Sequence, residues 1–157
     1  MKLLFTIISC FAMLNGNSQI KVDKAGNFWD KEVHRALTHI KEIDSTTYYY
    51  VQDNVDRISF WNENYNTFEI IEGKRVLLIS SLIMEKSLNN LSSTIVHESY
   101  HSCHAIDNAK PCKEELDAYL FELSFLFKMK DAEPWLIEFV YDKIRYYKIQ
   151  NERGDCK

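Results

Sequence analysis

The spacing of hydrophobic residues changes near Leu91. Before this position the chain carries short runs rich in β-branched and aromatic residues, which are typical of strands. These runs are residues 46–52, 55–61, 67–72 and 75–80. After Leu91, apolar residues recur at the spacing of helices. The sequence therefore predicts an α+β fold in which a small, mostly antiparallel sheet precedes a group of helices.

One helix is expected ahead of the sheet and three behind it. Residues 28–43 place Val33, Leu37 and Ile40 on one face, which indicates a lead helix. The later helices are expected over residues 93–106, 113–128 and 134–150, with Ser92 or Ser93 as a cap of the first and Pro134 at the start of the last. The chain has only four glycines and two prolines and no repeat or linker, so residues 19–157 are expected to form one domain.

The first 18 residues have a different character. Lys2 precedes an apolar run over residues 3–14, and small and polar residues follow at 16–18, as in a secretory signal peptide. The run is shorter than the roughly 20 apolar residues that a membrane span needs. We therefore expect residues 1–18 to be a cleaved signal peptide, the mature chain to have no transmembrane segment, and the protein to be periplasmic or secreted. Lipoprotein anchoring at Cys10 is the second, less favoured interpretation.

Charge and cysteine content narrow the choice of partners and of chemistry. The net charge is −4 and the basic residues are scattered, so nothing points to nucleic acid as a partner. Beyond the expected signal peptide the chain has three cysteines: Cys103, Cys112 and Cys156. In an exported protein this number favours one disulfide and one remaining thiol, with three pairings open.

The segment HESYH places two histidines four residues apart, with a glutamate directly after the first. On a helix, His97 and His101 lie about 40° apart and one turn apart, so both imidazoles can bind one metal ion. Glu98 lies about 100° from His97, where it can contact a water molecule beside the ion without binding the ion. This arrangement suits hydrolysis by a zinc-activated water, with Glu98 as general base and then general acid.

A catalytic zinc site needs a third protein ligand. His104 shares a face with His97 but lies about 10 Å further along a straight helix, so we expect it beside the site and not on the ion. Asp107 follows the motif helix, and Glu114 and Glu115 open the next helix, which can pack antiparallel across the motif. The spacing of the residues leaves these three carboxylates open as the third ligand.

HESYH followed by EELDAY resembles the gluzincin metallopeptidases, in which HExxH is followed on a later helix by a glutamate ligand. The resemblance covers about residues 97–119 and puts Glu115 at the ligand position, with the small Ala118 facing the motif helix. It implies a zincin-like metallopeptidase domain that binds Zn²⁺ through His97, His101 and Glu115. Peptides or proteins would then be its substrates.

Two features depart from that family. Only 13 residues separate His101 from Glu115, which is a short gap for the group. Tyr119 stands where many members carry an aspartate that hydrogen-bonds a zinc histidine, so we expect this task to fall to Glu122, Asp117 or a backbone carbonyl. Tyr119 itself is expected to be a core aromatic residue, and stabilising an oxyanion is its alternative role.

Two further expectations concern the surroundings of the motif. In zincin-like enzymes an edge strand pairs with an extended peptide, and residues 75–80 are the expected edge strand here. His34 and His39 lie five residues apart on the lead helix and do not share a face. We expect both of these histidines at the surface or half-buried.

The leading hypothesis is a small exported zinc metallopeptidase. The alternative is a non-catalytic interaction domain with a structural zinc site or with no metal. A structural site needs a fourth protein ligand, which Cys112 or Cys156 can supply as a thiolate if it is not in a disulfide, whereas Cys103 points away from His97. Glu98 argues against a structural site, because such a site has no use for a carboxylate there.

Overall fold

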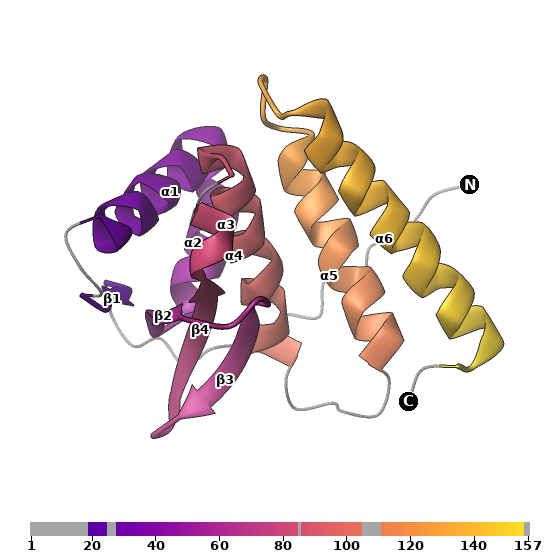
Figure 1. The fold of residues 1–157 in the computed structure, drawn as a ribbon, viewed down its shortest axis with the longest axis horizontal. Helices are drawn as coiled ribbons and strands as arrows, with labels where there is room; N and C mark the ends of the chain where they lie inside the picture. Colours follow the sequence, from indigo (N-terminus) through magenta and orange to yellow (C-terminus); the bar gives the residue numbers. More distant parts are fainter. Residues whose placement is uncertain (1–18, 25–27, 85, 105–110, 156–157) are drawn as a thin grey trace.

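The computed structural model describes residues 19–24, 28–84, 86–104 and 111–155, so the expected signal peptide and Cys10 lie outside the described residues. Within these residues the chain forms six helices and four strands (Figure 1). In chain order they are β1 (Lys21–Val22), α1 (Trp29–Ile43), α2 (Ser45–Asn54), β2 (Arg57–Trp61), β3 (Thr67–Ile71), β4 (Lys74–Ser80), α3 (Ser81–Met84), α4 (Leu88–His104), α5 (Pro111–Leu126) and α6 (Pro134–Arg153). The α+β class is confirmed. None of the described helices is both long and apolar enough to cross a membrane.

The four strands form a mixed sheet in the order β1-β2-β4-β3. Strand β2 runs parallel to both β1 and β4, whereas β3 pairs antiparallel with β4, so the mostly antiparallel sheet that we expected is wrong. The predicted edge strand is also wrong, because β4 lies between β2 and β3. Its residues 76–80 are all buried, which is typical of a strand with neighbours on both sides. The antiparallel edge of the sheet is β3.

Residues 46–52 lie in helix α2, so the strand predicted there is wrong. Asp44 caps this helix, accepting hydrogen bonds from the Thr46 backbone N–H and the Thr47 hydroxyl. Thr47 and Val51, one turn apart, are buried. The cap and this burial outweigh the strand propensity of the threonines and tyrosines. Helices α1 and α2 thereby form the crossover that allows β1 and β2 to run parallel.

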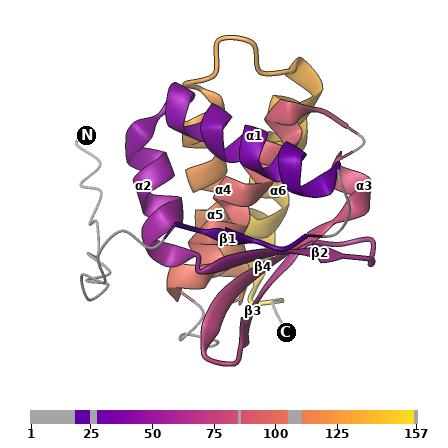
Figure 2. The same cartoon turned by 90° about the vertical axis from the view of Figure 1, so that its left-hand side faces the viewer.

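Helix α4 lies at the centre of the fold. It packs against α1, α2, β3 and β4 on one side and against α5 on the other, and α6 packs mainly on α5 (Figures 1 and 2). Residues 89–99 of α4 are all buried. Its start at Leu88 is one turn earlier than predicted, and α6 begins at Pro134 as predicted. The motif HESYH is thus carried by a helix with protein on both sides.

We expect the Ile95→Ala substitution to lower the free energy of unfolding by about 2–5 kcal/mol, because Ile95 is fully buried on α4 and its truncation leaves a cavity. The matched control is Ile70→Ala on β3, where the isoleucine is 63% exposed and the expected loss is below about 1 kcal/mol. Urea denaturation followed by circular dichroism measures both. Equal losses for the two variants would contradict the central position of α4.

Candidate metal centre

Helices α4 and α5 bring His97, His101 and Glu115 together. The Nε2 atoms of the two histidines lie 3.2 Å apart. The Glu115 carboxylate oxygens lie 3.8 Å from Nε2 of His97 and 3.5 Å from Nε2 of His101. One potential ligand atom from each residue lies within 4.8 Å of the others. The three residues that we expected to hold a metal therefore converge on one point.

A carboxylate contacts the other ring nitrogen of each histidine. The Nδ1–H of His97 donates to Glu122 at 3.1 Å, and the Nδ1–H of His101 donates to Glu114 at 3.2 Å. Of the groups expected to orient a zinc histidine, Glu122 makes this contact, while Asp117 forms an ion pair within its own helix. Glu114, considered as a ligand, instead contacts a histidine. Such contacts fix the tautomer and leave the lone pair on Nε2.

This arrangement fits a zinc ion. Two Nε2 atoms that face each other beside a carboxylate can share either a proton or a metal cation. Ligand atoms on a tetrahedral zinc with bonds of about 2.0–2.1 Å lie about 3.3 Å apart, close to the separations of 3.2, 3.5 and 3.8 Å. Two imidazoles with one glutamate are also a donor set of catalytic zinc sites, in which the fourth position remains open.

Glu98 lies beside this group, 8% exposed, in the wall of a cleft of about 140 Å³. Burial raises the pKa of Glu98 to about 7; the neighbouring His97 opposes this shift, and the carboxylates of Glu115 and Glu122 add to it. The other residues that line the cleft are Asn66, Ile83, Lys86, Asn90, Thr94, His97, Tyr119, Glu122, Trp135 and Phe139. The cleft therefore joins Glu98 to the surface between α4 and α6.

The two histidines have pKa values shifted in opposite directions. Burial lowers the pKa of His97, but its hydrogen bond to Glu122 and the charges of nearby carboxylates outweigh burial, so its pKa lies above the usual value. Burial and the neighbouring His97 lower the pKa of His101. The pair thus takes up one proton more readily than two.

Tyr119 lies between the core and the cleft. Its ring centroid is 4.2 Å from that of His97 and 5.7 Å from that of Tyr147 on α6. Burial raises its pKa, and the charges of Glu115 and Glu122 raise it further, so its hydroxyl stays protonated. The expected packing against the core is present, and the side chain also lines the cleft.

The remaining histidines do not belong to the group that could hold a metal. The Nδ1–H of His104 donates to the Tyr100 carbonyl at 3.0 Å, and its ring stacks on the Tyr100 ring with centroids 4.1 Å apart. His34 is exposed and His39 is half-buried, as predicted. Asp107, the remaining candidate for the third ligand, lies outside the described residues.

The aromatic residues that line the cleft were not among the site residues predicted from the sequence. Trp135 and Phe139 of α6 line it, and so does Asn66 at the start of β3. A signal for the first two was present, because Leu136 and Val140 occupy the adjacent, buried face of the same helix. A helix that is apolar on two neighbouring faces presents more hydrophobic surface than its core contact needs.

Both described cysteines, Cys103 and Cys112, are disulfide-bonded, and Cys156 lies outside the described residues. A thiolate of Cys112, considered above as a fourth ligand of a structural zinc site, is therefore not present in this structure. This removes one of the two cysteines on which the structural alternative depended.

Comparison with protein-family models, with curated proteins and with solved structures finds no match to this chain. The likeness to the gluzincins therefore rests on residues 97–119 alone.

We expect Glu122→Gln to weaken zinc binding by about tenfold, because a neutral amide holds the Nδ1–H of His97 less strongly than a carboxylate does. Competition with a chromogenic zinc chelator measures the affinity without any assay of activity. Asp117→Asn is the matched control on the same helix and should leave the affinity unchanged, since Asp117 pairs with Lys113. Equal affinities for the two variants would show that Glu122 does not support the metal-binding histidine.

Proposed function

We propose that this protein is an exported zinc-dependent metallopeptidase. In this proposal His97, His101 and Glu115 hold the zinc ion, and Glu98 is the general base and acid. The observation that carries it is the convergence of two Nε2 atoms and one carboxylate beside a buried glutamate in the wall of a cleft. Export is part of the proposal because of the signal-like order of residues 1–18.

The reaction is the addition of water across a peptide bond. When bound, zinc supplies a Lewis acid that polarises the substrate carbonyl and makes water a stronger nucleophile. The water oxygen bonds to the carbonyl carbon, and Glu98 accepts the proton that the water loses. The C–N bond then breaks, and Glu98 donates this proton to the leaving nitrogen. The products are a carboxylic acid and an amine, which exchange a proton to become a carboxylate and an ammonium group, and Glu98 ends in its starting state.

Two observations favour a catalytic site over a structural one. Among the residues that the structure describes, three side chains are close enough together to hold one ion, which matches a catalytic site with an open position. In addition, Glu98 lies in the wall of the cleft next to His97 without belonging to the group of potential ligands. A structural site would gain nothing from a buried carboxylate at this position, since burial of an ionisable group is costly.

The edge of the sheet suits an extended substrate. Strand β3 is the antiparallel edge, and Asn66, which directly precedes it, lines the cleft together with His97 and Glu98. The Oδ1 atom of Asn66 accepts a hydrogen bond from the Ser80 backbone N–H at 2.8 Å, which ties the start of β3 to the end of β4. A peptide paired with β3 as an added strand would therefore run toward Glu98.

The first test is the metal content of the purified protein by mass spectrometry. We expect about one zinc ion per chain, and we expect Glu115→Ala to lose most of it because one of three ligands is removed. Glu138→Ala is the control, since Glu138 is exposed on α6. Zinc content unchanged by Glu115→Ala would overturn the ligand set.

The second test separates chemistry from metal binding. Glu98→Gln should keep the zinc ion and lower kcat by roughly 10²- to 10⁴-fold, because the amide cannot accept the proton from water. Zinc content and peptide hydrolysis are measured on the same preparation. Retained turnover in this variant would contradict the role of Glu98, whereas loss of zinc would show that Glu98 is needed to form the metal site.

A further inference from the structure

Two large aromatic side chains lie exposed at the cleft. Trp135 and Phe139 of α6 are 44% and 47% exposed, and both line the same cleft as His97 and Glu98. They are four residues apart and therefore lie on one face of the helix. Aromatic rings left accessible beside polar groups are typical of a surface that binds a ligand.

The cleft has the size of one side chain. Its volume is about 140 Å³, close to the engineered apolar cavity of about 150 Å³ that binds benzene. Ile83 of α3 adds a further apolar side chain to the lining, and the exposed Lys86 also lines the cleft, with its Nζ 5.8 Å from the Trp135 ring centroid. An aromatic ring or a branched aliphatic group fits this space and would displace water from three apolar side chains.

We propose that this cleft selects peptides with a bulky apolar side chain, such as that of phenylalanine, beside the bond to be cleaved. Trp135 and Phe139 are the residues that determine this preference. The proposal rests on the proposed function, because the cleft is a substrate site only if Glu98 and the metal group act on peptides. The occupant is the substrate side chain, since the cleft that holds the aromatic pair also contains Glu98.

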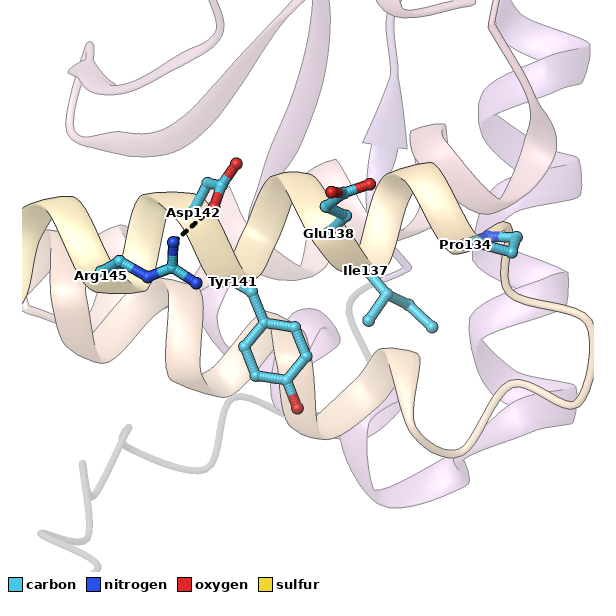
Figure 3. A pocket seen from close by; sticks show the side chains of 6 residues that line it. All are labelled: Pro134, Ile137, Glu138, Tyr141, Asp142 and Arg145. Carbon is cyan, nitrogen blue, oxygen red and sulfur yellow. Dashed lines mark ion pairs between the residues drawn. The ribbon is translucent and has the colours of Figure 1, made fainter.

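A second hollow on α6 lacks these features (Figure 3). Its lining comes from α6 alone: Pro134, Ile137, Glu138, Tyr141, Asp142 and Arg145. Tyr141 is 44% exposed, as much as Trp135, but it lies about 120° away around the helix. None of the residues of the metal group lines this hollow. Tyr141 therefore provides a matched control for exposed aromatic surface on the same helix.

The test uses pairs of fluorogenic peptides that differ only in having Phe or Ala beside the scissile bond. We expect the zinc-loaded protein to prefer Phe by roughly 10- to 100-fold in kcat/KM. The Trp135→Ala/Phe139→Ala double variant should lose most of this preference, while Tyr141→Ala should keep it. Because all three positions are exposed, these variants should fold, and circular dichroism checks this.

Binding is measured separately, by calorimetry on Glu98→Gln protein with the same peptides, with and without the double substitution. A Phe preference of about tenfold or more that disappears with the aromatic pair supports the proposal. Hydrolysis with equal rates for Phe and Ala peptides, or a preference that survives the double substitution, overturns the proposal and leaves the proposed function standing. Absence of zinc-dependent hydrolysis, with the Phe preference in binding retained, overturns the proposed function and leaves the selectivity of the cleft.

Discussion

Residues 89–99 of helix α4 are buried, so every polar group along this stretch needs a partner inside the protein. Two serines find their partners within the same helix: the hydroxyls of Ser93 and Ser99 donate to carbonyl oxygens of the preceding turn. His97 cannot do so and depends on Glu122 of the neighbouring helix. Because α4 and α5 run antiparallel, His101, the later histidine of the motif, contacts Glu114 near the start of α5. The polar groups of α4 thus contribute to how α5 packs against it.

The same interface concentrates negative charge. Glu98 and the three α5 carboxylates, Glu114, Glu115 and Glu122, surround two imidazoles. Buried carboxylates are stable only when positive charge or hydrogen-bond donors compensate them. Glu98 and His97 both have raised pKa values, so both take up protons more readily than usual. Proton uptake is one way to reduce the negative charge of this interface. A divalent cation at the point where both Nε2 atoms converge would be another way, and it would bind through the Nε2 lone pairs of both histidines.

Sequence patterns predicted the parts of this molecule that depend on local spacing. The spacing of His97 and His101 determined that the two rings face one side of a helix, and periodicity indicated helix α1, α4, α5 and α6. Helix α2 was missed because its cap at Asp44 and its buried face override the propensity of its residues. The parallel pairing was missed with it, since β1 has only two residues and gives no pattern, and residues 46–52 in the second half of the crossover were predicted as a strand. Local spacing carries no information on which elements become neighbours.

Local sequence spacing also could not predict that Trp135 and Phe139 line the cleft. Trp135 and Phe139 reach the cleft because α6 packs on α5, while Glu98 reaches it from α4. Helix α5 therefore sets the distance between Glu98, the proposed general base, and the apolar wall, and the contacts of His97 and His101 with the glutamates of α5 help to hold α5 to α4. Groups that would hold the metal are thus the groups that align the two walls of the cleft. If Glu98 and the metal group act on peptides as proposed, chemistry and substrate selection would depend on one interface, and a domain of this size would need no separate specificity module.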